Sequence, residues 1–307
     1  MSFAGVSETV CDMLGVALSP ETVRKTVEDH GRRMTRFQAD AQQSERSDEA
    51  FRQAAGEVEI AIDAGKVNTR EEGWKDLKIA VISKRPTGPA RTASAWKSQN
   101  LPLPTMVLAF AMIAPAKTFR KELRPRLRRL GVTTMASVHA LADGASWIWK
   151  AVGRTLTGCV ETLDVFHACQ HVSRCAECIF GEGTAATRTA YREGRSLLIE
   201  KGWPGICAWV GTLLNVTDEA ERERRRPATE RLLGYFGKHM TRLNYAERLR
   251  SGRAIGSGQV EGAAKTLGLR LKRRAARWRK RNVRALASVI CVRHSFHEWA
   301  AYWSLAA

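Results

Sequence analysis

The sequence has no apolar run long enough to cross a membrane. Its longest strongly apolar stretch, residues 106–116, is far shorter than the roughly 20 residues that a spanning helix needs. The N-terminus also lacks the basic and then apolar pattern of a secretory signal peptide. We therefore expect a cytoplasmic protein without a membrane partner.

The sequence also lacks signs of a nucleotide cofactor and of a disulfide framework. The Gly-rich phosphate loop that precedes Lys-Ser or Lys-Thr in many nucleotide-binding proteins is missing, so nothing in the sequence indicates ATP as a cofactor. The seven cysteines are an odd number, which suits free thiols of an intracellular protein better than a disulfide framework.

Acidic residues are in the minority. The 307 residues include 50 Lys and Arg against 31 Asp and Glu, which gives a formal net charge of +19. Such an excess attracts a polyanion. Hydrophobic residues make up 44% of the chain, enough to bury a core in one large domain or two smaller ones.

Alternating side chains predict strands in the first part of the chain. Residues 57–62 alternate between apolar and other side chains and lead directly to Asp63. A second strand is predicted over residues 77–82, at a spacing that favours antiparallel pairing with the first. Residues 85–104 are rich in Pro, Gly, Ser and Thr and predict a loop. Residues 106–113 suit either a third strand or a buried helix.

The second part begins with a strand–helix–strand pattern that is typical of an α/β protein. One predicted strand ends at Asp143, and another, over residues 159–163, is followed by Asp164. Helical periodicity then continues from residue 167 to about 249, with interruptions at 202–205 and 218–226. Residues 260–307 predict one long helix or two, the first half of which is strongly basic.

Three carboxylates occupy places that suit a metal-dependent phosphodiester enzyme: Asp63, Asp143 and Glu261. Singly, they can be explained as a turn residue, a helix cap and a partner of Lys265. Together, carboxylates on two strand ends and one helix start can converge on two Mg²⁺ ions, or on Mn²⁺ in their place. Such a pair, about 3.5–4 Å apart, activates a nucleophile and stabilises the leaving oxygen.

Short motifs surround each carboxylate. In chain order they are Ala61-Ile62-Asp63-Ala64-Gly65-Lys66-Val67, Ala142-Asp143-Gly144-Ala145, Leu163-Asp164-Val165-Phe166-His167-Ala168 and Ile255-Gly256-Ser257-Gly258-Gln259-Val260-Glu261. In order and context, from about residue 18 to the C-terminus, they resemble the DDE transposases of ISKra-type bacterial insertion sequences.

The resemblance implies an α/β fold, namely an RNase H-like mixed-sheet core that is interrupted by an all-α insertion domain and flanked by helical N- and C-terminal segments. In such a core the first Asp lies on the first strand and the second Asp on the fourth. The implied domains are a helical N-terminal region (1–55), the first part of the core (56–166), the insertion domain (167–250) and the rest of the core with a Glu-bearing basic helix (251–307). Because similar transposases begin with a longer DNA-binding region, we expect this chain to start inside it.

The resemblance also implies an activity. The protein would cut and join double-stranded DNA at element ends and target, with two metal ions held by Asp63, Asp143 and Glu261. It would act as a homo-oligomer on DNA, associated with the nucleoid. Two rival functions stay open: a truncated or domesticated derivative that only binds DNA, and an RNase H-like nuclease that acts on branched DNA or hybrids.

A pair of residues after the last predicted strand is expected near the site. Asp164 and His167 match an acidic residue and a His that similar transposases carry there, which implies a role in positioning DNA or the insertion domain. A simple core position for His167 is the alternative. We do not expect zinc, because His167, His171, Cys175 and Cys178 would spread over roughly 16 Å of one helix and could not surround a single ion.

Two basic segments are candidates for phosphate contacts, with a solvated helix face as the alternative for each. The first covers residues 117–129. In the second, which follows Glu261, we expect a helix that lies along the DNA backbone, and so strongly salt-dependent binding. Its residues are Lys265, Arg270, Lys272, Arg273, Arg274, Arg277, Trp278, Arg279, Lys280, Arg281 and Arg284.

Overall fold

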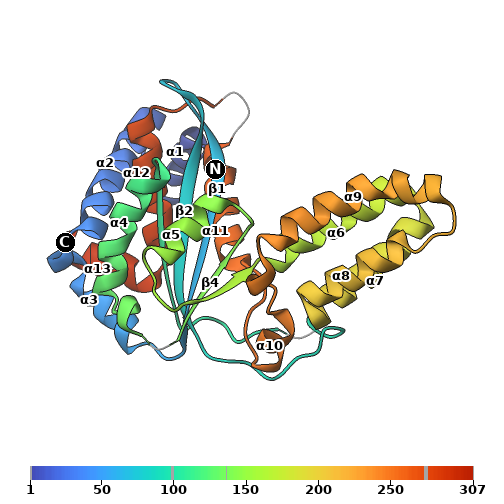
Figure 1. Ribbon diagram of the computed structural model, residues 1–307. Helices are drawn as coiled ribbons and strands as arrows, with labels where there is room; N and C mark the ends of the chain where they lie inside the picture. Colours follow the sequence, from blue (N-terminus) through green and yellow to red (C-terminus); the bar gives the residue numbers. More distant parts are fainter. Residues whose placement is uncertain (1, 98–99, 136, 273–275, 307) are drawn as a thin grey trace.

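The structure, a computed structural model, describes residues 2–97, 100–135, 137–272 and 276–306. Within these residues the helices and strands follow one another as shown in Figure 1. Their bounds are α1 (Phe3–Leu14), α2 (Pro20–Ala39), α3 (Ala41–Gln53), β1 (Glu57–Thr69), β2 (Gly73–Arg85), β3 (Met106–Ile113), α4 (Ala116–Arg129), β4 (Val138–Ala142), α5 (Ser146–Gly153), β5 (Val160–Leu163), α6 (Val165–Phe180), α7 (Ala185–Lys201), α8 (Trp203–Leu214), α9 (Glu219–Gly237), α10 (Tyr245–Arg250), α11 (Gly258–Leu271), α12 (Lys280–His294) and α13 (Phe296–Ala306).

The core is one five-stranded mixed sheet with the strand order β3-β2-β1-β4-β5. β1 and β2 are antiparallel, as are β2 and β3, whereas β4 and β5 lie parallel to β1. The predicted fold class is confirmed, since this is an RNase H-like sheet interrupted by helices. The third predicted strand is a strand and not a helix, because its backbone pairs with β2 along its whole length.

The first strand is longer than the sequence pattern predicts. Asp63 lies in the middle of β1, and the ladder with β2 continues beyond it to a turn closed by Gly73, whose φ is +66°. Pairing between β1 and β4 stops at Ile62 and Ala142. Asp63 therefore lies where β1 separates from β4. Because β4 does not continue beside it, there is open space next to Asp63.

Each face of the sheet has its own apolar core. Ile60 and Ile62 of β1 face α3, α4 and α5, and each such buried side chain contributes about 1.5–3 kcal/mol. Ala61 and Val67 of β1 face α11 and α12 on the opposite side. Because side chains alternate along a strand, Asp63 belongs to the face that α11 and α12 cover.

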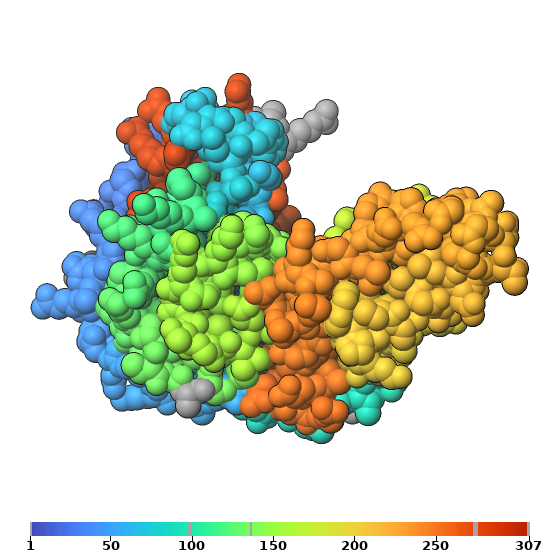
Figure 2. Space-filling model, viewed as in Figure 1, coloured from blue at the N-terminus to red at the C-terminus, as the bar shows by residue number. Residues whose placement is uncertain are grey.

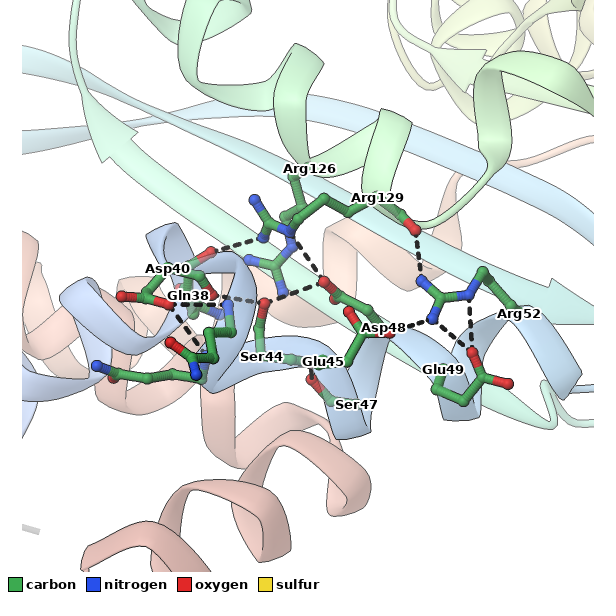
Figure 3. Close-up of polar contacts among 12 residues, drawn as sticks. Gln38, Asp40, Ser44, Glu45, Ser47, Asp48, Glu49, Arg52, Arg126 and Arg129 are labelled. Atoms are coloured by element: carbon green, nitrogen blue, oxygen red, sulfur yellow. Dashed lines mark hydrogen bonds and ion pairs between the residues drawn. The ribbon is translucent and has the colours of Figure 1, made fainter.

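The basic helix α4 is only partly a surface feature. Arg126 is 3% exposed and forms an ion pair with buried Glu298 of α13. Arg129 pairs with Asp48 of α3, at 2.9 Å between Nε and Oδ2 (Figure 3). The backbone carbonyl of Arg129 also accepts a hydrogen bond from Arg52. Arg126 and Arg129 thus connect α4 to α13 and α3. The prediction that residues 117–129 form a phosphate-contacting surface is therefore wrong for these two arginines. The exposed cations of α4 are Lys117, Lys121, Arg124 and Arg128.

Helices α6 to α9 form an arm that projects from the sheet and its covering helices (Figures 1 and 2). The predicted break over residues 218–226 is wrong, because Asp218 caps α9 and the stretch is helical from Glu219 onward. Pairs of Glu and Arg three residues apart, such as Glu221 with Arg224, explain why so charged a stretch is helical. The domain limits proposed above stay a prediction.

The C-terminal part contains three helices where the sequence predicts one or two. The basic run does not continue as a single helix from Glu261, because α11 ends at Leu271 and α12 begins only at Lys280. Between them Trp278 bonds through its backbone N–H and C=O to Asn68 and Arg70 of the β1–β2 hairpin. Arg273 and Arg274 lie outside the described residues. In the described part of the chain, no helix is long and apolar enough to cross a membrane.

His139 on β4 makes the stability of the sheet depend on pH. Its Nδ1 accepts from Arg248, an obligate donor, at 2.9 Å, which requires a neutral imidazole. Burial, followed by the charge of Arg248, lowers the pKa of His139 from 6.5 to about 4. Glu57, 3.3 Å away, has a pKa of about 2 because of Arg253, so it stays charged above pH 4.

The free energy of unfolding should therefore fall as the pH drops from 6.5 towards 4. In that pH window His139 is protonated in the unfolded chain but stays neutral in the folded protein. A difference of one bound proton changes the free energy of unfolding by up to about 1.4 kcal/mol per pH unit. Urea denaturation at pH 7.5 and pH 5 should show a smaller difference for His139→Gln than for the wild type. Equal differences in the two proteins would contradict this role.

Candidate active site

Three neighbouring parallel strands each end in, or pass through, an aspartate at the same level of the sheet. In the ladders Ile62 pairs with Ala142, which pairs in turn with Leu163. The next residue of each strand is acidic, and the three are Asp63, Asp143 and Asp164. Parallel strands in this register place equivalent side chains side by side, so the backbone alone gathers three carboxylates. The backbone N–H of Asp164 donates to the carbonyl of Ala142 at 2.7 Å and extends this register by one residue.

The fourth carboxylate, Glu261, comes from the first turn of α11. Buried Asp164 holds the start of this helix, because its Oδ2 accepts from the backbone N–H of Ser257 at 2.6 Å and from the Ser257 hydroxyl at 2.8 Å. One ligand atom from each of Asp164, His167 and Glu261 lies within 4.8 Å of the others. The structure thus brings Glu261 to the same edge of the sheet as the aspartates, although it is 118 residues beyond Asp143 in the chain.

Burial and neighbouring charges raise the pKa of two of these carboxylates, Asp63 and Glu261. Burial raises the pKa of Asp63, and the charge of Asp143 raises it further. The pKa of Glu261 is also raised, first by burial and then by Asp164 and Asp63. The charges of His167 and Lys272 act in the opposite direction on Asp63 but do not outweigh burial. The hard oxygen ligands of the carboxylates are the type that Mg²⁺ and Mn²⁺ prefer, so the donor set fits such ions.

Asp164 and His167 form a link inside the site. Oδ1 of Asp164 caps α6 by accepting from the His167 backbone N–H at 2.9 Å, and it also lies 3.2 Å from Nδ1 of the same residue. Burial acts to raise the pKa of Asp164, but hydrogen bonds from His167 and Ser257 outweigh it and lower that pKa. The bond to Asp164 in turn raises the pKa of His167. Asp164 therefore connects the starts of two helices, α6 of the arm and α11 of the core.

Tyr235 of the arm also reaches the site, and sequence reasoning missed it. Its ring stacks on His171, with ring centroids 3.5 Å apart. A Cβ on Gly144, the residue after Asp143, would lie 2.5 Å from the Tyr235 hydroxyl. Burial, with added repulsion from Asp143, raises the pKa of Tyr235. The glycine directly after Asp143 was the only signal in the sequence for so close a neighbour.

Gly144→Ala should therefore lower any activity of this site by about tenfold or more, because the new methyl group has to displace either the arm or Asp143. The companion change Tyr235→Ala, which removes the obstructing ring, should restore part of the loss in the double variant. Gly153→Ala is the matched control, since a Cβ there meets no atom within 4 Å. Rates of DNA cleavage for the four proteins provide the test, and full activity of Gly144→Ala would contradict the close contact.

The described residues that were predicted to contact DNA fall into three groups. Lys265 and Lys272 line a hollow of about 530 Å³ together with Asp63. Others make contacts inside the protein: the Trp278 indole donates to the Leu271 carbonyl at 2.9 Å, and Lys280 pairs with Glu72 at 2.8 Å. The guanidinium of Arg270 lies over the rings of Phe3 and Trp278, while Arg277, Arg279, Arg281 and Arg284 are exposed.

The His and Cys residues that were considered as zinc ligands have different environments in the structure. His171 stacks on Tyr235, Cys175 is buried and Cys178 is exposed. Among the described residues, the group of His, Cys, Asp and Glu side chains close enough to hold an ion is Asp164, His167 and Glu261. His167 thus faces the carboxylates of the core and not the cysteines of its own helix.

No protein-family model matches the chain, and no curated protein matches it. Among solved structures, one similar chain is that of the Drosophila P element transposase strand transfer complex. The similarity covers 97% of this chain and 93% of that chain, with 9% sequence identity and a TM-score of 0.43. Similarity at this level does not assign the chain to a family.

Proposed function

We propose that this protein is a DNA transposase of the DDE type, which cuts DNA at the ends of an insertion sequence and joins it to a target. The proposal is supported chiefly by the register of β1, β4 and β5, which aligns Asp63, Asp143 and Asp164, and by Glu261, whose carboxylate lies within 4.8 Å of ligand atoms of Asp164 and His167. The motifs around these residues, which resemble those of ISKra-type transposases, support the same function. The overall charge of +19 fits a polyanionic substrate.

In this proposal Asp63, Asp143 and Glu261 would hold the Mg²⁺ ions. The ions, when bound, supply Lewis acidity for attack on a phosphodiester and for departure of the leaving oxygen. The protein's own part is to fix the ligands. Two aspartates lie on strands of a rigid sheet, and Asp164 anchors the helix that carries Glu261. We further propose that the protein works as a homo-oligomer on DNA within the nucleoid.

In the same proposal, Lys265 and Lys272 contact the phosphates next to the cleaved bond. Both are exposed and line the hollow that contains Asp63, and the charge of Lys272 acts on the Asp63 carboxyl. Contacts to phosphates give affinity without reading the sequence, and each one adds to the salt dependence of binding.

Replacing both Lys265 and Lys272 with Gln should lower the slope of log Kd against log salt concentration by up to about 2. Without these two phosphate contacts, fewer counterions are released from the DNA on binding. The matched control changes Lys117 and Lys121 to Gln on α4, which covers the other face of the sheet. Fluorescence anisotropy with labelled duplex DNA over a range of NaCl concentrations measures the slopes. The same slope for both double variants would contradict the placement of DNA along α11.

The test of the function uses the DNA that flanks the gene. A plasmid that carries both flanks should be cut by the protein in Mg²⁺ at terminal inverted repeats, with new 3′-hydroxyl ends that then join to target DNA. Binding to those ends without nicking in Mg²⁺ or Mn²⁺ would instead indicate a derivative that only binds DNA. Cutting that follows branched structure or RNA–DNA hybrids, irrespective of the terminal sequence, would indicate a nuclease.

A further inference from the structure

A larger hollow, of about 810 Å³, lies beside the carboxylates at the start of α11. Ala61 of β1 and Leu141 of β4 line it, each two residues before one of the aspartates of the site. Since residues two apart on a strand share a face, the hollow and the carboxylates open on the same side of the sheet. Residues 256–259, the turn that leads to Glu261, line it as well. A strand of DNA at the carboxylates would thus have this hollow as its neighbour.

One wall of the hollow is aromatic. Phe166 lies between Asp164 and His167 in the chain and is 43% exposed, unusual for a phenylalanine in so structured a region. Its ring centroid is 5.5 Å from that of Trp96, which is 8% exposed and fixes the ring from behind. A Cβ on Gly256 would come within 3.0 Å of Phe166, so the glycine allows the ring to lie against the turn. The Phe166 ring is therefore fixed by its neighbours, and part of it is exposed to the hollow.

Other residues of the lining provide donors and positive charge. Arg91 is 6% exposed, and although its Nη2 donates to the Arg253 carbonyl, its Nε has no partner among the described residues. Within the same part of the chain, the buried amide nitrogen of Gln259 has no acceptor either. Lys97 is exposed and lies over the Trp96 ring at 5.3 Å. The carboxylate of Glu59 does not balance these charges, because it is engaged with Arg85 at 2.8 Å.

We propose that this hollow binds an unpaired nucleotide of the DNA strand that runs past the carboxylates. The base stacks on Phe166, its edge accepts from Gln259, and its phosphate faces Arg91 and Lys97. A ligand with an aromatic plane, acceptors and a negative charge matches the three chemical features of the walls. The inference rests on the proposed function, because it takes the substrate of the carboxylates to be DNA, and it assigns the hollow to the nucleotide next to the cleaved bond.

The test measures binding in EDTA, so that no cleavage occurs. Two fluorescent probes are compared by anisotropy: a blunt duplex, and the same duplex with a single-stranded oligo-dT extension. Wild-type protein should bind the extended probe more tightly. Phe166→Ala should lose about tenfold or more in affinity for the extended probe and bind the blunt duplex unchanged, while Phe166→Tyr, which keeps the stacking surface, should behave as the wild type.

A fluorescent base analogue in the extension reports stacking directly. Its emission should be quenched on binding to the wild type and to Phe166→Tyr, and not on binding to Phe166→Ala. The proposal is overturned if Phe166→Ala, folded by circular dichroism, keeps the preference for the extended probe. It is also overturned if free dTMP displaces the extension at equal concentration, since the hollow would then be a site for mononucleotides.

The two proposals fail in different ways. If the hollow is misassigned, Phe166→Ala keeps the wild-type preference, whether or not the protein cuts DNA. If the proposed function is wrong, the wild type shows the Phe166-dependent preference in EDTA and yet never cuts DNA in Mg²⁺. Asp143→Asn separates them further, because it should lose cutting in Mg²⁺ and keep the preference for the extended probe over the blunt duplex in EDTA.

Discussion

Asp143→Asn should reduce metal-dependent DNA cleavage by at least about 10³-fold. An amide in place of this carboxylate removes one negative ligand, and metal stabilisation of the reacting oxygens amounts to several kcal/mol, where each 1.4 kcal/mol corresponds to a factor of ten. The Asp143 Oδ1 accepts from the Ala145 backbone N–H at 2.8 Å, and the Asn carbonyl can accept the same bond. The variant should therefore fold as the wild type does.

Asp63→Asn provides the sharper companion to that experiment. The pKa of Asp63 is raised by burial, then by Asp143, so its charged form destabilises the folded protein without metal. At neutral pH in EDTA, Asp63→Asn should thus melt at the same temperature as the wild type or at a higher one, while its cleavage is lost. Asp12→Asn, an exposed aspartate on α1, is the control that should leave both properties unchanged. Wild-type cleavage by either site variant would contradict the assignment.

The second large effect concerns stability. Glu298→Gln should lower the free energy of unfolding by about 3–5 kcal/mol, because it leaves the Arg126 guanidinium buried without its counter-charge. Two nitrogens of Arg126 already lack partners among the described residues, so nothing nearby can replace the carboxylate. Gln38 also donates to Glu298, at 3.3 Å, and its bond would be weakened too. Urea denaturation followed by circular dichroism measures the loss.

A double variant separates the pair from its surroundings. Arg126→Met combined with Glu298→Leu removes both charges and should recover most of the lost stability, as buried ion pairs replaced by apolar side chains commonly do. Glu21→Gln, which breaks an exposed pair with Arg24, should change stability little. If Glu298→Gln were as stable as the wild type, the ion pair would not hold α4 and α13 together.

Features that depend on neighbours in the chain could be predicted from the sequence. Alternation through residues 57–62 predicted β1, and the apolar run over residues 106–113 suited the strand that is found there as β3. One strand was predicted to end at Asp143 and another directly before Asp164, and in the structure β4 ends at Ala142 and β5 at Leu163. Local patterning decides such features because strand and helix periodicity act over a few residues.

Features that depend on distant contacts could not be predicted. The continuation of β1 beyond Asp63 is a matter of pairing with β2 and of the bonds between Asn68 and Trp278, 210 residues later. Arg126 looked like part of a basic surface because its partner, Glu298, lies 172 residues away. The contact of Tyr235 with Gly144 likewise joins the arm to the core. Only the folded chain brings these residues together, and neither composition nor spacing identifies the partner of each.

One measurement tests most directly whether Asp143 holds a catalytic metal: cleavage by Asp143→Cys in Mg²⁺ and in Mn²⁺, with reductant present. A thiolate is a poor ligand for Mg²⁺ and a better one for Mn²⁺. We predict that the variant is inactive in Mg²⁺ and regains part of its cleavage in Mn²⁺, while Asp12→Cys behaves as the wild type in both. Equal cleavage by Asp143→Cys and the wild type in Mg²⁺ would contradict the proposed site.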